Sequence, residues 1–244
     1  MNARTRRIPL ALFSLALALA CAQSRPRESA APHALTADEE RAVHALLQSF
    51  GADGPLSPRL EERVAFHLAK LRQRDPGAIA ERQKQVWPII AGALAAEKLP
   101  EWLGAMAYVE SRFEPGVRGG AACAGLWQFT APTARRFGLR VDEGAAAQPD
   151  LVDERLDPEK SSRAAARYLA TLIDEFGRGS FLLALASYNA GETKVHAAVA
   201  QSSAAGGESP GDFWTLDERG LFSEETSNYV PRVLAAALVF AAPR

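Results

Sequence analysis

The sequence predicts an all-α protein built around one substantial domain. Apolar residues recur at helical spacing through most of the chain, and almost no segment shows the period-2 alternation of a half-buried strand. The chain has 244 residues, of which 48% are hydrophobic and 23% charged. This length and composition favour one true hydrophobic core over two large domains.

Residues 1–20 are predicted to be a lipoprotein signal peptide and are set aside from the fold. Three arginines near the start precede an apolar stretch over residues 8–20, which is too short to span a bilayer stably. The stretch ends in Ala-Leu-Ala-Cys, which resembles a lipobox with Cys21 as the lipidated residue. Ordinary cleavage near Cys21 is the alternative.

Residues 21–34 are expected to form a flexible tether, and residues 35–98 a helical lead-in. A first helix is expected from Thr36, with apolar residues at helical spacing: Ala42, Leu46, Leu47 and Phe50. A second is expected from Ser57-Pro58 to a turn at residues 75–77, with one apolar face: Val64, Leu68 and Leu71. A third is expected from about Ile79 to Lys98, with Pro88 as a candidate bend.

Residues 99–244 are expected to form the main domain. Pro100 suits a first helical position, and the helix that follows is expected to end at Pro115-Gly116. Its apolar stripe consists of Trp102, Leu103, Met106, Val109 and Phe113. A glycine-rich loop over residues 116–125 then leads to a short helix at about residues 130–137.

The second half of this domain is also predicted to be helical. After a loop at residues 140–156, the pattern Asp157-Pro158-Glu159 indicates an N-cap and an acidic first turn, so a helix is expected from there to Gly177. Further helices are expected at residues 181–190, which are almost wholly apolar, and at 192–200, before a polar loop at 201–211. The last helix is expected to be capped by Ser223 and kinked at Pro231.

Charge and metal-ligand patterns exclude several function classes. Without residues 1–20 the chain keeps 25 basic and 29 acidic residues, a formal charge of −4, and no basic stripe indicates nucleic-acid binding. Cys123 is expected to be a small buried residue, and no disulfide is expected if Cys21 carries lipid. The four histidines lack metal-ligand spacing, so neither a metal nor a cofactor is predicted.

Four strings carry the functional signal. They are AYVESRFE at residues 107–114, GLWQ at 125–128, ASYNAG at 186–191 and TSNYVPR at 226–232. In this order they resemble the catalytic domain of the family 1 lytic transglycosylases, the soluble-lytic-transglycosylase and goose-lysozyme-like superfamily, over roughly residues 85–241. The resemblance implies a lysozyme-like helical fold and cleavage of peptidoglycan glycan strands.

Within this family, the sequence is most similar to the membrane-bound lytic murein transglycosylase D type. That type shares GLWQ, where much of the superfamily has Met in place of Trp127, and a string like Asp212-Phe213-Trp214. The sequence differs in lacking the LysM glycan-binding repeats of that type. Substrate affinity is therefore expected to come from the cleft and from the lipid anchor.

Glu110 is the predicted catalytic residue. Glycoside cleavage needs a proton donor at the leaving oxygen, and Glu110 lies in an apolar helical stripe between Val109 and Phe113. Partial desolvation there is expected to raise its pKa, which suits a general acid near neutral pH. A solvated helix glutamate is the alternative from this residue alone, and the other three strings outweigh it.

No second carboxylate stands at a motif position, and Glu114 is interpreted as a solvated residue at the helix end. The resemblance implies a mechanism that needs only one. Glu110 would protonate the glycosidic oxygen, the N-acetyl group of the muramic acid would stabilise the anomeric centre, and Glu110 would then deprotonate the C6 hydroxyl. The product would be a 1,6-anhydro-muramic acid end.

The resemblance assigns the remaining strings to substrate binding. Ser111 would bond near the acetamido or C6 oxygen, and Gly125 would let the backbone approach the sugar. Leu126 belongs to the same substrate-binding string. Trp127 would stack on a sugar unless it is core, and Gln128 would bond the substrate or hold Glu110.

Three further residues belong to this expected site. Tyr188 and Asn189 place polar groups in an apolar helix, where they must find partners, and by resemblance they shape the cleft floor. Tyr229 would point its hydroxyl at Glu110 or the acetamido group, with a core tyrosine as the alternative.

The leading hypothesis is therefore a lytic transglycosylase that binds peptidoglycan strands and is anchored by Cys21 to a membrane. Ala22 after the cysteine implies, by resemblance, the outer membrane facing the periplasm. The alternatives are a goose-lysozyme-like muramidase, which hydrolyses the same bond, and an inactive glycan-binding envelope lipoprotein. No protein partner is indicated.

Overall fold

The computed structural model describes residues 34–52, 54–73, 76–142, 144, 150–204 and 211–241. Within these ranges the chain is helical, and its extended pairing is limited to three isolated β-bridges. The all-α prediction is confirmed. None of the described helices combines the length and apolarity needed to cross a membrane. The predicted signal peptide, Cys21 and nearly all of the tether lie outside the described residues.

Three helices form the lead-in: α1 (Ala37–Gln48), α2 (Pro58–Arg72) and α3 (Pro76–Ala96). The first two begin where predicted, and each has a side-chain cap. The Thr36 side chain accepts from Glu39 N while the Glu39 carboxylate accepts from Thr36 N, which makes a capping box, and Ser57 accepts from Leu60 N.

Two details of the lead-in differ from expectation. Leu47 and Phe50 of the predicted apolar face are buried, but Val43 is buried in place of Ala42. The third helix begins at Pro76 and not at Ile79, since a proline fits the first turn of a helix, where its missing N–H is no loss. Pro88 lies inside α3.

The main domain contains seven α-helices and four short 3₁₀ turns among the described residues. The α-helices are α4 (Ala105–Ser111), α5 (Ala131–Arg136), α6 (Pro158–Phe176), α7 (Phe181–Ala190), α8 (Glu192–Ala204), α9 (Phe213–Glu218) and α10 (Glu224–Phe240). The 3₁₀ turns are η1 (Glu101–Gly104), η2 (Gly120–Ala122), η3 (Glu154–Leu156) and η4 (Arg178–Ser180).

The predicted helix after Pro100 is wrong in two respects. Its first turn is the 3₁₀ turn η1, and α4 ends at Ser111, well before Pro115. It ends there because Arg112 and Phe113 have φ values of 56° and 60°, the left-handed region, which no α-helix can continue through.

The expected boundaries after residue 180 are partly wrong as well. Helix α7 occupies the apolar run as predicted, but α8 continues to Ala204, into the segment expected to be a loop. The Asp212-Phe213-Trp214 string begins a helix that was not anticipated. Asp212 caps α9 by accepting from Thr215 N, and Phe213 is buried.

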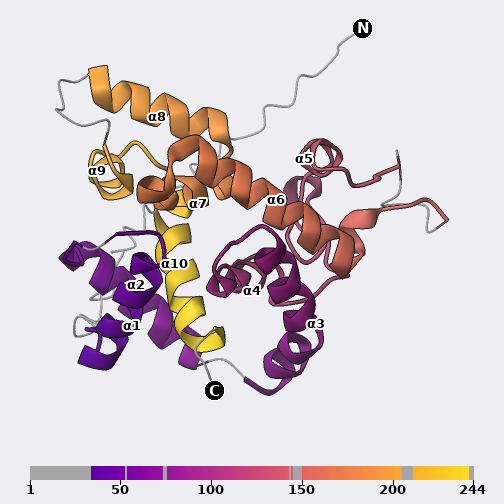
Figure 1. Cartoon of the computed structure of the whole chain (residues 1–244), viewed down its shortest axis with the longest axis horizontal. Helices are drawn as coiled ribbons and strands as arrows, with labels where there is room; N and C mark the ends of the chain where they lie inside the picture. The colour runs from indigo at the N-terminus through magenta and orange to yellow at the C-terminus, as the bar shows by residue number, and fades with distance from the viewer. Residues whose placement is uncertain are drawn as a thin grey trace, which may run out of the picture. The chain divides into compact units, whose positions relative to one another are not determined.

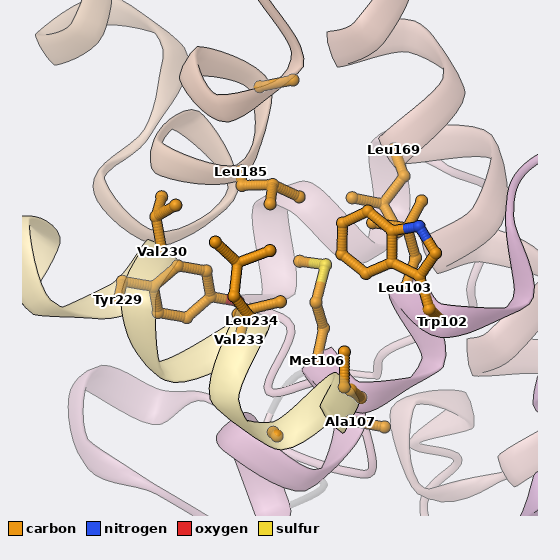
Figure 2. Packing of buried hydrophobic residues seen from close by; sticks show 14 of the residues in the cluster. Trp102, Leu103, Met106, Ala107, Leu169, Leu185, Tyr229, Val230, Val233 and Leu234 are labelled. Atoms are coloured by element: carbon orange, nitrogen blue, oxygen red, sulfur yellow. The ribbon is translucent and has the colours of Figure 1, made fainter. Parts of the chain in front are cut away.

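Helix α10 lies in the middle of the other helices and contacts α2, α4 and α7 (Figure 1). Around it, side chains from α4, α6, α7 and α10 close the core, with Met106 among them (Figure 2). Met106, Leu185 and Leu234 are fully buried. Burying side chains of this size contributes roughly 1.5–3 kcal/mol each to folding.

The described lead-in and main domain form one compact unit with one continuous core. Polar contacts cross the expected boundary near residue 99. Arg59 and Arg63 on α2 form ion pairs of 2.8 and 3.2 Å with the buried Asp217 on α9, and Trp102 Nε1 donates to Ser49 Oγ at 2.9 Å. The lead-in therefore braces α9, α10 and η1.

Candidate active site

Glu110 lies in the last turn of α4, one residue before the helix ends. Glu110 is only partly exposed, and burial raises the pKa of its carboxyl to about 7. The hydrogen bond from Tyr229 and the charge of Arg232 lower this pKa, but burial outweighs them. Glu110 is thus half protonated near neutral pH, as a group that first gives and then takes a proton requires.

The Tyr229 hydroxyl donates to Glu110 Oε1 at 2.6 Å. This contact is one of the two expected for Tyr229, and it joins α10 to α4 across 119 residues of sequence. Tyr229 is 2% exposed, and burial raises the pKa of its hydroxyl well above the usual value. The tyrosine is therefore a neutral donor that holds the carboxyl in one orientation.

A second carboxylate acts on this site, and the sequence reasoning missed it. Glu225, exposed in the first turn of α10, raises the pKa of Glu110 through charge repulsion. It directly precedes the TSNYVPR string. Its position was the signal that could have identified it.

Ser111 connects α4 to the GLWQ string. Its buried hydroxyl lies 2.9 Å from Ala107 O and 2.8 Å from Leu126 O, and it accepts from Glu114 N. These contacts position the residue after the acid and the loop beside it. Glu114 itself is exposed beyond the end of α4, in agreement with its interpretation as a solvated end residue.

The backbone at position 125 requires a glycine, whether or not Gly125 also contacts a sugar. Its φ is +83°, and a Cβ there would lie 1.8 Å from the carbonyl oxygen of Arg155. Leu126 and Trp127 are fully buried, and Trp127 Nε1 donates to Ser162 Oγ at 2.9 Å. The structure therefore places both side chains in the core, away from a sugar-stacking face.

Gln128 holds the glycine-rich loop instead of Glu110. Its Nε2 donates to Gly125 O at 2.8 Å and to Val117 O at 3.4 Å. The residue has a φ of 48°, and Ala122 in the same loop has a φ of 59°. Together with Arg112 and Phe113, these non-glycine residues in the left-handed region concentrate backbone strain around Glu110, a pattern common at active sites.

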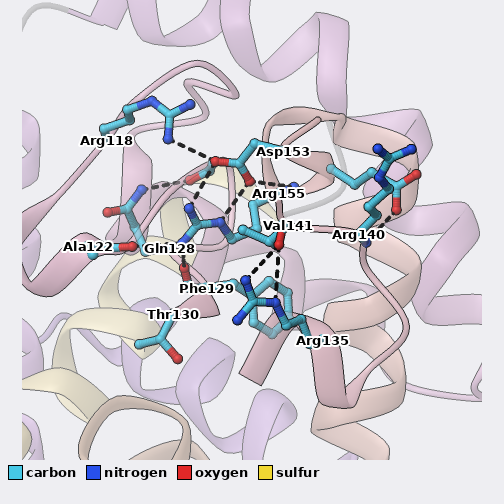
Figure 3. A network of polar contacts seen from close by, with 12 residues as sticks. Arg118, Ala122, Gln128, Phe129, Thr130, Arg135, Arg140, Val141, Asp153 and Arg155 are labelled. Atoms are coloured by element: carbon cyan, nitrogen blue, oxygen red, sulfur yellow. Dashed lines mark hydrogen bonds and ion pairs between the residues drawn. The ribbon is translucent and has the colours of Figure 1, made fainter. Parts of the chain in front are cut away.

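A network of ion pairs and hydrogen bonds holds this loop (Figure 3). Arg155 binds both oxygens of Asp153, at 2.8 and 2.9 Å, and donates to the carbonyls of Ala122 and Phe129. Arg118 joins the same carboxylate at 2.8 Å. Burial acts to raise the pKa of Asp153, but the hydrogen bonds from Arg155 and Arg118 outweigh it and hold the pKa below its usual value.

Tyr188 and Asn189 have found the partners that their positions require. The Tyr188 hydroxyl donates to Trp127 O at 2.9 Å, and Asn189 Oδ1 accepts from the Thr226 hydroxyl at 3.1 Å. The ASYNAG string is thereby tied to GLWQ on one side and to TSNYVPR on the other. Asn189 Nδ2 has no hydrogen-bond partner among the described residues, and both side chains are partly exposed.

The four strings thus meet at one place in the fold, around the Glu110 carboxyl. Tyr229 donates to it directly. Burial, and after it the charge of Glu110, raises the pKa of Tyr188 and of Cys123, which places both near this carboxyl. Cys123 is partly exposed, not buried as expected. In the described part of the chain, no group of three or more His, Cys, Asp or Glu side chains is arranged to hold a metal ion.

Comparison with known proteins supplies the family. Residues 88–209 match the family described as "Transglycosylase SLT domain". Membrane-bound lytic murein transglycosylase D of Escherichia coli K12 is 34% identical over 181 residues, which are 74% of this chain and 36% of the relative. Peptidoglycan transglycosylase gp16 of phage T7 is 37% identical over 132 residues, 54% of this chain and 9% of the relative.

Solved structures support the same fold. The soluble lytic transglycosylase SLT70 of Escherichia coli aligns over 83% of this chain and 30% of its own, with a TM-score of 0.51 and 19% identity. An inactive mutant of lytic transglycosylase Slt from Pseudomonas aeruginosa aligns over 76% of this chain and 31% of its own, with a TM-score of 0.50 and 24% identity. The expected lysozyme-like fold is confirmed.

This chain spans about a third of the length of transglycosylase D. The matched family region, residues 88–209, contains the first three of the four strings. The family match covers half of the chain, from within α3 to beyond α8. Sequence and fold agree, and the chain belongs to the transglycosylase SLT domain family.

Proposed function

We propose that the protein is a peptidoglycan lytic transglycosylase that cleaves the β-1,4 bond between N-acetylmuramic acid and N-acetylglucosamine. The observation that carries this proposal is the Glu110 carboxyl, which has a pKa of about 7 and accepts a hydrogen bond from a neutral tyrosine. The names of the relatives, murein and peptidoglycan transglycosylases, point to the same substrate.

Glu110 acts first as the acid. Its proton passes to the glycosidic oxygen as the bond from that oxygen to C1 of the muramic acid breaks, and the 2-acetamido oxygen stabilises the positive charge at C1. The carboxylate then takes the proton of the C6 hydroxyl while that oxygen bonds to C1. No water is consumed, and the product ends in 1,6-anhydro-muramic acid.

The surroundings of Glu110 support this two-way proton transfer. Tyr229 holds the carboxyl and lowers the pKa of Glu110, which favours the carboxylate formed after the first step. The Asn189 amide, whose Nδ2 lacks a protein partner in the described part of the chain, is a donor suited to the acetamido group or to a sugar hydroxyl. Five residues hold the loop beside Glu110 through contacts inside the protein: Ser111, Gly125, Leu126, Trp127 and Gln128.

Hydrolysis is the second candidate, because Glu225 supplies a second carboxylate near Glu110. In that reaction Glu225 would position a water molecule for attack on C1. Glu225→Gln separates the two reactions. A lytic transglycosylase would keep forming anhydro ends, whereas a muramidase would lose its reducing-end products by about 100-fold or more.

The decisive measurement is mass spectrometry of muropeptides released from purified peptidoglycan by the protein and by Glu110→Gln. Products one water lighter than hydrolytic muropeptides, resistant to borohydride and absent with the variant, are expected. The loss with Glu110→Gln should be about 10²- to 10⁴-fold. Reducible ends would establish the muramidase, and glycan binding without any release would establish an inactive binding protein.

We further propose that the protein works in the bacterial cell envelope, anchored to the outer membrane through lipid on Cys21. The membrane-bound relatives support an envelope location. Metabolic labelling with a fatty-acid probe, compared with Cys21→Ser, tests the anchor. Label on the Cys21→Ser protein would overturn it.

A further inference from the structure

A cavity of about 340 Å³ lies between α2, α4 and α10. It is separate from the site around the Glu110 carboxyl, although Val109, the residue before Glu110, belongs to its lining. The residues that matter for its chemistry are His67, Lys70, Tyr108, Val109, Arg112 and Arg232. We call this cavity the basic cavity.

Positive charge dominates this cavity. Lys70, Arg112 and Arg232 line it, and its lining contains no carboxylate. None of the three forms an ion pair within the described part of the chain, although the Lys70 ammonium lies 4.1 Å from the centre of the Phe66 ring. Three cations that line one cavity, none of them in an ion pair with a described residue, favour an anionic ligand.

His67 reports the same positive potential from inside the cavity wall. It is 8% exposed, and burial followed by the charges of Arg232, Lys70 and Arg63 lowers the pKa of its imidazole to about 4. The contact between its Nε2 and Asn228 Oδ1, at 3.3 Å, opposes this shift only in part. At neutral pH the ring is therefore uncharged and serves as a probe of any charge that enters.

Tyr108 adds an unmet hydrogen bond to the wall. The residue is 3% exposed, and its hydroxyl has no hydrogen-bond partner among the described residues. A buried hydroxyl without a partner destabilises the folded protein. An acceptor bound in the basic cavity, with a small adjustment of the wall, would relieve that cost.

The basic cavity is also linked to the acid. Arg232 follows Tyr229 by three residues on α10, a rise of about 4.5 Å along the helix. Arg232 lowers the pKa of Glu110 through its charge, so it lies within electrostatic reach of the reacting carboxyl. Val109 directly precedes Glu110. A ligand group in this cavity would therefore lie close to the bond that is cut.

We propose that the basic cavity binds the carboxylates of a stem peptide carried by the glycan strand, next to the sugar held at Glu110. The identity of the strand rests on the proposed function. Along peptidoglycan, the peptides are the substituents that bring several carboxylates beside each muramic acid. The enzyme would accordingly favour peptide-substituted strands over strands from which an amidase has removed the peptides.

A binding experiment tests this without bond cleavage. The catalytically silent Glu110→Gln protein is titrated with a free stem peptide while the His67 ring resonances are followed by NMR. Bound carboxylates should raise the pKa of His67, and the affinity should fall as salt rises. Lys70→Gln combined with Arg112→Gln should weaken peptide binding roughly tenfold, whereas Lys84→Gln, an exposed lysine on α3, should not change it.

Two outcomes of that titration would overturn the assignment. One is an unchanged His67 signal at millimolar peptide. The other is an equal response to inorganic phosphate at the same concentration, which would make the cavity a general anion site. Peptide binding without any lytic activity would leave the cavity assignment standing and overturn the proposed function, so the two can fail separately.

A rate assay measures the consequence for the substrate. The ratio of kcat/KM on peptide-bearing strands to kcat/KM on peptide-free strands should fall roughly tenfold in the Lys70→Gln/Arg112→Gln protein. Lys84→Gln should keep the original ratio. An equal loss on both substrates would show that these cations serve the glycan itself or the fold, and would contradict a peptide site.

Discussion

At the residue scale, the proposed reaction depends on the desolvation of the Glu110 carboxyl. Glu110 combines a pKa of about 7 with a single strong donor, the Tyr229 hydroxyl, at 2.6 Å. Burial raises the pKa and the hydrogen bond lowers it, so the balance of the two sets the pH at which Glu110 changes its protonation state.

Activity should follow this pKa. The acid must be protonated in the free enzyme, so kcat/KM is expected to fall as pH rises above about 7. In Tyr229→Phe the donor that lowers the Glu110 pKa is gone, and the alkaline limb should move to higher pH while kcat falls by about tenfold or more. A pH profile of muropeptide release checks both. An alkaline limb that stays in place would show that Tyr229 does not act on the Glu110 pKa.

The same pKa makes a prediction about stability. The native pKa of Glu110 is raised above the unfolded value of 4.5, so the folded protein binds more protons between pH 4.5 and 7 and loses stability as pH rises through that window. Glu110→Gln removes this penalty and should be more stable than the original by roughly 1–3 kcal/mol at pH 8 but equal to it near pH 4. Urea unfolding at the two pH values measures the difference, and an equal gain at both would contradict the buried-acid account.

At the element scale, the glycine-rich loop is held by buried polar contacts that have no sequence signature. Arg155 binds Asp153 and the carbonyls of Ala122 and Phe129, and Gly125 packs against the Arg155 carbonyl. These contacts hold the loop that leads into GLWQ.

Removing Arg155 should therefore be costly. Arg155→Met would leave the buried Asp153 carboxylate short of its main partner, at a cost of about 3–5 kcal/mol in the free energy of unfolding. Arg163→Met is the matched control, because its ion pair with Glu159 is exposed and should be worth less than about 1 kcal/mol. Denaturant unfolding of both variants makes the comparison, and similar losses would show that the network is not a special support.

Gly125→Ala tests the backbone requirement at the same element. The new Cβ would meet the Arg155 carbonyl oxygen at 1.8 Å with φ at +83°, so the loop must move, and a loss of at least about 3 kcal/mol is expected. Gly116→Ala, in the same loop with open space around its Cβ, should cost little. Thermal unfolding of the two variants decides whether the close approach to Arg155 is the cause.

At the scale of the whole molecule, the lead-in is part of the fold. Helix α2 packs along α10, and its arginines pair with Asp217 on α9. Helix α10 carries Tyr229, so the lead-in braces the residue that orients the acid.

A chain that begins at residue 99 should consequently fail to fold cooperatively. It would expose the apolar face of α10 that α2 covers and leave the buried Asp217 without its two arginines. A chain that begins at residue 34 should keep a single sharp thermal transition. Calorimetry on the two chains is the test, and a cooperative transition in the shorter one would establish an independent catalytic domain.

Much of this protein was determined by its sequence alone. The all-α class, the helix starts at Thr36 and Ser57, the caps at Asp157 and Ser223, and the extent of α7 follow from local rules. Helix periodicity and side-chain capping act within a few residues. The contact between Tyr229 and Glu110 was predicted from the four strings, and the role of Glu110 as the acid stays a prediction.

Only the tertiary structure decided what these groups touch. In the folded protein α4 ends at Ser111, and Leu126 and Trp127 are buried in the core. Gln128 donates a hydrogen bond to the glycine-rich loop. It also brought Glu225 near the acid and gathered Lys70, Arg112 and Arg232 around one cavity. The burial of a carboxyl, the close approach of two backbone segments and the clustering of cations all depend on residues far apart in the chain. No local sequence pattern could therefore reveal them.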